Sequence, residues 1–269
     1  MMAGQQEIWS SGSAYESYVG RWSRLVAREF LAWLAVAPDL CWLDVGCGTG
    51  ALSQTILEHM APRLVVGVDF SEGYITFARE HIRDGRAAFL QGDARALPVM
   101  PASYDVVVSG LALNFIPQPE QAVAEMARAA RTGGIVAAYV WDYAGRMQFM
   151  RTFWNAATAL DPAALQLDEG RRFPLCQPEP LRQLFQDAGL HKVLVRSIDV
   201  ATIFRNFDDY WSPFLGGQGS APGYVMSLSD EQRALLREQL RTMLPTRADG
   251  SIFLTARAWA VCGMRNNHL

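Results

Sequence analysis

The sequence predicts a doubly wound α/β fold, in which helices cover both faces of a mostly parallel sheet. From about residue 40 to 142, short apolar segments alternate with segments of helical length. These short segments are apolar on both faces, which is typical of parallel strands buried between helices. A glycine-rich turn, Gly46–Gly50, follows the first of them. Together these observations predict a series of βαβ units.

The elements follow from this alternation. Five interleaved strands are expected at Cys41–Val45, Leu64–Asp69, Ala87–Gln91, Tyr104–Ser109 and Ile135–Trp141. Helices are expected between them at Ala51–Met60, Glu72–Arg83 and Pro119–Arg131. The third helix begins with a proline in its first turn and ends before two glycines, so both of its boundaries carry a signal.

The rest of the chain is less regular. Two late strands are expected at Lys192–Val200 and Ile252–Cys262. A helix with a capping-box pattern begins at Ser229, and its expected apolar stripe is Leu235, Leu236, Leu240, Met243 and Leu244. We expect one domain over residues 1–269, with a helical cap at 1–39 and a cofactor-binding core at 40–142. Insertions at 143–178 and 202–250 are expected to form an acceptor pocket or lid. The aromatic group Phe207, Tyr210, Trp211 and Phe214 is either part of that lid or ordinary packing.

Composition narrows the function. The formal net charge of −3 provides no basic surface for nucleic acid. No apolar run is long enough for a membrane span, and the first residues do not resemble a signal peptide, so a cytoplasmic location is expected. The four cysteines lack the spacing of a metal site or redox pair and are expected to be reduced and buried. No metal is predicted.

Acidic residues at strand ends indicate which kind of ligand the glycine turn would bind. The turn fits a dinucleotide fingerprint, which alone is a weak signal. Asp69 ends the second strand about twenty residues later, where a carboxylate accepts hydrogen bonds from ribose hydroxyls. Asp93 follows the third strand, where it can accept from an adenine amine, and Ala94 leaves room for the ring. Asp44 can orient the turn or reach an amino group.

Each assignment has an ordinary structural alternative. Asp44 and Asp93 can cap a loop or short turn, and Asp69 can cap the helix that follows it. Phe70 can be a core aromatic residue.

The chain resembles the class I S-adenosylmethionine-dependent methyltransferases, and within them the branch that includes the ubiquinone/menaquinone C-methyltransferases (methyltransferase type 11). The matching motifs are Asp44–Gly50, Val68–Ser71, Gly92–Ala94, Tyr104–Val108 and Arg131–Gly134. The resemblance implies a seven-stranded sheet of order 3-2-1-4-5-7-6 with strand seven antiparallel.

The resemblance also implies roles for individual residues. The turn residues Gly46, Cys47, Gly48 and Gly50 would meet the methionyl part of the cofactor. Phe70 would pack on adenine. Ser109 and Asn114 lie at the end of the fourth strand, where the transferred methyl is expected. Tyr18 and Arg21 belong to a segment that resembles the family's cap helix, where Arg21 can pair with a carboxylate and an aromatic wall can face the sulfonium. The same segment can instead be an ordinary amphipathic surface helix.

These observations predict a methyltransferase that uses S-adenosyl-L-methionine and a small organic acceptor, attacked at O, N or an activated carbon. No catalytic base stands out, and none of the four histidines lies near a cofactor-side strand end. Asp142 and Tyr143 are better placed, just past the fifth strand. One alternative is a module that binds S-adenosylmethionine without transfer. Another is an NAD-dependent oxidoreductase, disfavoured because no Tyr-x-x-x-Lys pair is present. The sequence names neither the acceptor nor the oligomeric state.

Overall fold

A computed structural model describes residues 21–216 and 219–266. The chain divides into two compact units, each described by itself. The core unit comprises residues 22–141, 175–198 and 258 onward, and the second unit contains residues 142–174 and 199–257. The expectation of one domain with additions at 143–178 and 202–250 stays a prediction.

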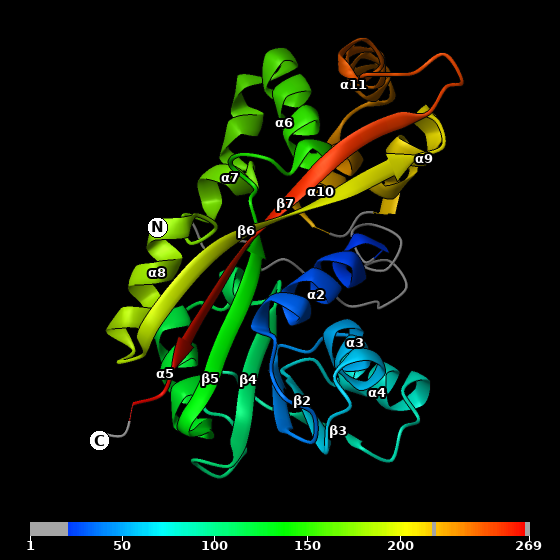
Figure 1. The fold of residues 1–269 in the computed structure, drawn as a ribbon. Helices are drawn as coiled ribbons and strands as arrows, with labels where there is room; N and C mark the ends of the chain where they lie inside the picture. Colours follow the sequence, from blue (N-terminus) through cyan, green and yellow to red (C-terminus); the bar gives the residue numbers. More distant parts are fainter. Residues whose placement is uncertain (1–20, 217–218, 267–269) are drawn as a thin grey trace. The chain divides into compact units, whose positions relative to one another are not determined.

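A seven-stranded sheet organises the fold (Figure 1). Its strands are β1 (Cys41–Val45), β2 (Leu64–Asp69), β3 (Ala87–Gln91), β4 (Tyr104–Gly110), β5 (Ala130–Trp141), β6 (His191–Phe204) and β7 (Ile252–Met264). The order β3-β2-β1-β4-β5-β7-β6 and the antiparallel pairing of β7 with β5 confirm the prediction. Since β1 to β4 pair in parallel, their carboxyl ends lie at one edge of the sheet.

Helices flank the strands of the core unit. They are α2 (Arg21–Leu34), α3 (Ala51–His59), α4 (Glu72–His81), α5 (Pro119–Ala129) and α8 (Pro178–Asp187). The α3 and α4 helices pack against β2, and α5 packs against β4, β5 and α8. The α2 helix contributes Phe30, whose ring lies 4.8 Å from that of Tyr139 on β5. This cover explains why β1 and β4 are buried almost throughout and carry apolar residues on both faces.

Two expectations about the core unit were wrong in detail. Strand β3 is not buried on both faces: it lies at the sheet edge, and Phe89 is its one buried residue. The α5 helix ends at Ala129 rather than Arg131, because residues 130–134 already belong to β5. The pairing of β4 with β5 shifts register between Tyr104 and Val106, and Gly133 has a φ of +73°. This irregularity hides the start of the strand from sequence periodicity.

The second unit is built around aromatic packing. Its longest helices are α6 (Gln148–Leu160) and α11 (Asp230–Met243), with shorter pieces at α7 (Glu169–Arg172), α9 (Phe207–Trp211) and α10 (Ser220–Ser227). Phe214 stacks on Phe149 at 4.7 Å and on Phe153 at 4.4 Å between ring centroids. All four residues of the predicted aromatic group are buried, so their role in this unit is packing.

Helix α11 confirms one prediction and corrects another. The Ser229 hydroxyl accepts from the Gln232 amide, and the Gln232 side chain accepts from the Ser229 amide, as the capping-box pattern predicts. Leu236 and Leu240 of the expected apolar stripe are buried, whereas Leu235 is 57% exposed.

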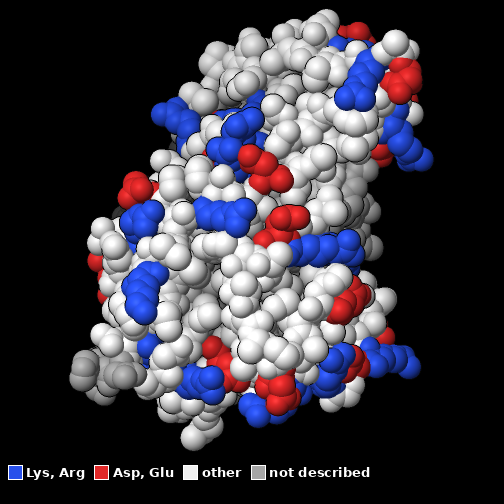
Figure 2. Space-filling model, viewed as in Figure 1, with Lys and Arg blue, Asp and Glu red and all other residues white. Residues whose placement is uncertain are grey.

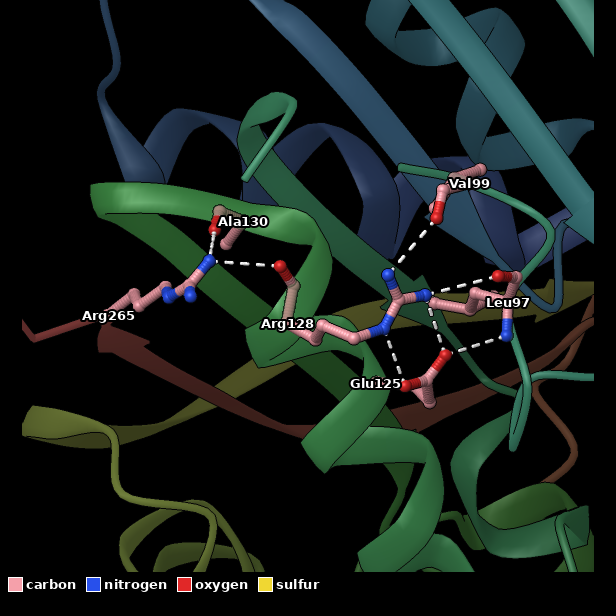
Figure 3. Close-up of polar contacts among 6 residues, drawn as sticks. All are labelled: Leu97, Val99, Glu125, Arg128, Ala130 and Arg265. Atoms are coloured by element: carbon pink, nitrogen blue, oxygen red, sulfur yellow. Dashed lines mark hydrogen bonds and ion pairs between the residues drawn. The ribbon is translucent and has the colours of Figure 1, made fainter. Parts of the chain in front are cut away.

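A polar network holds the loop after β3 against α5 (Figure 3). The Glu125 carboxylate accepts from the Leu97 amide at 2.8 Å and from the Arg128 guanidinium. Arg128 also donates to the carbonyl oxygens of Leu97 and Val99, both at 3.1 Å. Near the C-terminal end of α5, Arg265 donates to the carbonyl oxygens of Arg128 and Ala130. The segment that follows Asp93 is therefore fixed to a helix of the core.

The surface charges are mixed. On the face drawn in Figure 2, basic and acidic side chains lie interspersed. Many charged side chains among the described residues form close pairs, such as Arg86 with Asp84 at 2.7 Å. No helix in the described ranges is long and apolar enough to cross a membrane.

Candidate functional site

The glycine turn joins β1 to α3, and its three glycines have different surroundings. Gly46, Gly48 and Gly50 all have positive φ, at +72°, +53° and +89°. A Cβ on Gly46 would lie 2.5 Å from the Ala112 side chain, and one on Gly50 would lie 2.4 Å from Ile82. A Cβ on Gly48 would meet no atom of the described residues within 4 Å. Two glycines therefore permit tight packing, whereas Gly48 leaves its backbone open to close approach by a ligand.

Asp69 ties the end of β2 to this turn. Its Oδ2 accepts from the Gly48 amide at 2.9 Å, and its Oδ1 accepts from the Ser71 amide at 2.9 Å. The N-cap of α4 is Ser71, so the alternative that Asp69 caps this helix is wrong. Burial raises the pKa of Asp69, and the two amide donors oppose that rise. Each oxygen retains acceptor capacity, so this carboxylate fits a pair of vicinal hydroxyls.

Asp44, which lies on β1 two residues before Gly46, is a completely buried carboxyl group. Its Oδ2 accepts from the Ser53 hydroxyl of α3 at 2.7 Å, and its Oδ1 has no hydrogen-bond partner among the described residues. Burial raises the pKa of Asp44 from 3.8 to about 7; the hydrogen bond from Ser53 opposes the rise, and the nearby Asp69 adds to it. A buried oxygen without a donor is costly, so this position favours a ligand that brings an N–H group or a positive charge.

Phe70 presents its ring to solvent. Its side chain is 75% exposed, so the alternative of a core aromatic residue is wrong. The side-chain amide of Gln91 donates to the Phe70 backbone carbonyl at 3.2 Å, which links the ends of β2 and β3. An exposed ring next to Asp69 is suitable for stacking on a flat heterocycle.

Asp93 lies in a turn after β3, with Ala94 half-buried beside it. Its Oδ1 accepts from the Arg95 amide at 2.8 Å, which is the turn-capping role considered from the sequence. Both oxygens also accept from the Arg95 guanidinium. This ion pair holds the pKa of Asp93 below its ordinary value.

The end of β4 adds two polar groups without hydrogen-bond partners among the described residues. Ser109 is fully buried and its Oγ is unpaired, as is the buried Nδ2 of Asn114 in the short 3-10 helix η2 (Leu113–Phe115). Ser109 is the second-last residue of β4, and Asn114 lies four residues past the end of this strand, at the sheet edge where ligands of open α/β folds bind.

Cys47 is buried with Ile75, Ala78 and Phe89, and burial raises the pKa of its thiol well above the ordinary range. Its side chain is therefore an uncharged part of the core, and its backbone is what the turn can offer to a ligand.

Three further residues named in the sequence analysis are not among the groups described above. Tyr18 falls outside the described residues, and Arg21 begins α2 without a described side chain. Asp142 accepts from the amides of Gly145 and Arg146 through its two oxygens, so it shapes a turn in the second unit. No cluster of three potential metal ligands occurs in the part of the chain that the structure describes.

Sequence reasoning did not identify Ser53 and Arg95. Each has a signal in the sequence, since Ser53 is a small polar residue in the first turn of an apolar helix and Arg95 follows Asp93 by two positions.

Comparisons with known proteins place this geometry in a family. Residues 43–138 match a methyltransferase domain family. The demethylmenaquinone methyltransferase of Roseiflexus sp. (strain RS-1) is 34% identical over 181 residues, which cover 60% of this chain and 73% of that protein. The Staphylococcus aureus (strain JH9) enzyme of the same name is 28% identical over 188 residues, covering 65% of this chain and 76% of its own.

The fold agrees with this result. Phosphoethanolamine N-methyltransferase 2 of Haemonchus contortus, solved in complex with S-adenosyl-L-methionine, superposes with a TM-score of 0.59. The match covers 95% of this chain and 56% of that one at 16% identity, so it is a likeness of fold. The chain belongs to the class I S-adenosylmethionine-dependent methyltransferases.

Proposed function

We propose that this protein transfers the methyl group of S-adenosylmethionine to a small organic acceptor, at the carboxyl ends of β1 to β4. The observation that carries the proposal is the open backbone at Gly48, which donates to Asp69 and follows the buried Asp44, one of whose oxygens has no partner among the described residues. Bound S-adenosylmethionine supplies a methyl group on a positively charged sulfur, which a nucleophile attacks in line. The chain's own residues bind and orient the two reactants.

The donor set of the site fits the parts of this cofactor. Asp44 Oδ1 needs a donor, and the cofactor's ammonium group would provide one. Asp69 can accept from both ribose hydroxyls, and the exposed Phe70 can stack on adenine. Asp93 and Ala94 lie where the adenine amine and ring edge would meet β3. The backbone of Gly46, Cys47, Gly48 and Gly50 would border the methionyl part.

Groups at the end of β4 would border the methyl group. Ser109 Oγ and Asn114 Nδ2 are buried there, and both retain hydrogen-bonding capacity within the described structure. Such groups can orient a polar acceptor or the sulfonium end of the cofactor. No described residue is assigned as a base. Attack by a nucleophilic acceptor needs positioning alone, and when a ring carbon is methylated, the proton that this carbon carried then passes to solvent.

The acceptor is proposed from the names of the relatives. Two of them are named demethylmenaquinone methyltransferases. We therefore propose an electron-rich ring carbon of a quinol-like molecule as the first acceptor to test, and O or N of other small molecules after it. The roles of residues 143–178 and 202–250 in acceptor binding, and a cytoplasmic location, stay predictions.

Transfer of radiolabel tests the proposal. The protein is incubated with S-adenosylmethionine labelled with tritium in its methyl group, together with either reduced demethylmenaquinone or a small-molecule cell extract. We expect label in an organic-soluble product, and its loss in Asp69→Ala. Folded protein that binds S-adenosylhomocysteine but labels no acceptor would support a binding module instead. Fluorescence quenching by NADH without any response to S-adenosylhomocysteine would support the oxidoreductase.

A further inference from the structure

Arg95 contacts both carboxylate oxygens of Asp93 through its guanidinium and its backbone amide. Its Nε lies 3.0 Å from Oδ1 and 3.1 Å from Oδ2, and its Nη2 lies 2.7 Å from Oδ2. The Arg95 amide adds a fourth contact, at 2.8 Å from Oδ1. The guanidinium therefore binds both carboxylate oxygens through Nε and Nη2 and fixes the side-chain orientation of Asp93.

This contact leaves room for one more donor on the carboxylate. Its two oxygens together accept about four hydrogen bonds. The Arg95 amide donates to Oδ1, Nη2 donates to Oδ2, and Nε is shared between the two oxygens. The side chain of Asp93 is 33% exposed, so the carboxylate can also accept from a ligand amine.

Helix α5 holds Arg95 in turn. The Nη1 of Arg95 donates to the Gln118 side chain at 2.6 Å, and Gln118 is the residue immediately before α5. Further along the loop, Glu125 and Arg128 bind residues 97–99 without using Arg95 (Figure 3). The loop therefore has two separate anchors, and the first acts on the orientation of Asp93.

We propose that Arg95 is a positioning residue that orients the carboxylate of Asp93 toward the 6-amino group of adenine, and so makes the donor site selective for aminopurines. This inference rests on the proposed function, in which Asp93 lies at the adenine. Without the Arg95 guanidinium, the carboxylate would keep only the contact from the backbone amide of residue 95 at Oδ1. Its other oxygen would be hydrated and less well oriented, and its hydrogen bond to the amine would contribute less.

The test compares two ligands by calorimetry. One is S-adenosylhomocysteine, and the other is its analogue that carries purine without the 6-amino group. We expect wild-type protein to bind the amino compound at least tenfold more tightly. In Arg95→Gln this ratio is expected to fall to about threefold or less, through weaker binding of S-adenosylhomocysteine alone. Arg95→Lys, which retains one ionic contact, is expected to lie between them.

Arg86→Gln is the matched control. Arg86 grips Asp84 through the same three kinds of contact, its amide, Nε and Nη2, at the opposite end of β3. We expect this variant to retain the wild-type ratio.

Each outcome has a distinct meaning. Equal weakening of both ligands in Arg95→Gln would mean that Arg95 merely supports the loop, which overturns the inference. So would an unchanged ratio, or tighter binding of S-adenosylhomocysteine, which would show that Arg95 competes with the amine. If folded wild-type protein binds neither ligand, the proposed function itself fails.

Discussion

Asp44 gives a prediction that can be worked through quantitatively. Its pKa is about 7 in the folded protein, against an ordinary value of 3.8, because the carboxyl is buried. Since the folded-state pKa is the higher one, the unfolded chain loses this proton first as the pH rises. The free energy of unfolding therefore falls between about pH 4 and pH 7, and the loss is complete above pH 7. At about 1.4 kcal/mol per pH unit, the total is about 4 kcal/mol.

The substitution Asp44→Asn removes this titration and keeps an oxygen that can accept from Ser53. It leaves an amide NH2 group where Oδ1 was, which has a cost that does not depend on pH. Of the 4 kcal/mol, about 1.5 kcal/mol is already lost at pH 5. The free energy of unfolding of Asp44→Asn relative to wild type should therefore rise by about 2.5 kcal/mol between pH 5 and pH 8.

Urea unfolding at both pH values measures this difference. Tryptophan fluorescence and circular dichroism should give coincident transitions, which justifies a two-state treatment. Titrations of groups that do not interact with Asp44 occur in both proteins and cancel in the comparison. A difference that stays constant within about 0.5 kcal/mol from pH 5 to pH 8 would refute the reasoning, because Asp44 would then be ionised in the folded protein throughout.

Three further substitutions test the site and the packing. Asp69→Asn should weaken S-adenosylhomocysteine binding by about 10- to 100-fold, since hydrogen bonds to a charged group contribute about 1.5–3 kcal/mol; unchanged affinity in calorimetry would exclude ribose binding there. Phe70→Ala should weaken the same ligand by about 3- to 10-fold while the free energy of unfolding changes by less than about 0.5 kcal/mol, because its ring is exposed. Phe153→Ala, the matched change at a fully buried ring, should lower the unfolding free energy of its unit by about 3–5 kcal/mol. Equal stability losses for the two phenylalanine variants would contradict the burial on which both expectations depend.

The sequence predicts the bounds of a strand well where an apolar run ends at a residue that also ends the strand in the folded sheet. Strands β1, β2 and β3 have the predicted bounds, because apolar runs end at clear punctuation: Gly46, Asp69 and Gly92. The start of β5 could not be predicted, since Arg131–Gly134 has the composition of a loop and is recruited into a strand by pairing that shifts register. Exposure of β3 depends on its place at the sheet edge, which residue type alone does not reveal.

The candidate site shows the same limit. Asp69 and its link to Gly48 follow from motif spacing, but the exposure of Phe70 and the unpartnered oxygen of Asp44 are properties of packing. The ion pair between Arg95 and Asp93 depends on a turn that brings together two side chains separated by two positions in the sequence. The aromatic group at 207–214 was equally compatible with a lid or a core. The distinction required the positions of Phe149 and Phe153, about 60 residues earlier in the chain.

The central claim is that the carboxyl ends of β1 to β4 hold S-adenosylmethionine through Asp69 and the open turn at Gly48. Calorimetric titration of S-adenosylhomocysteine into wild-type and Asp69→Ala protein tests it most directly. The account predicts one ligand bound per chain in the wild type, displaced by S-adenosylmethionine, and binding at least tenfold weaker in the variant. Folded wild-type protein that gives no binding, or a variant that binds as tightly as wild type, would contradict it.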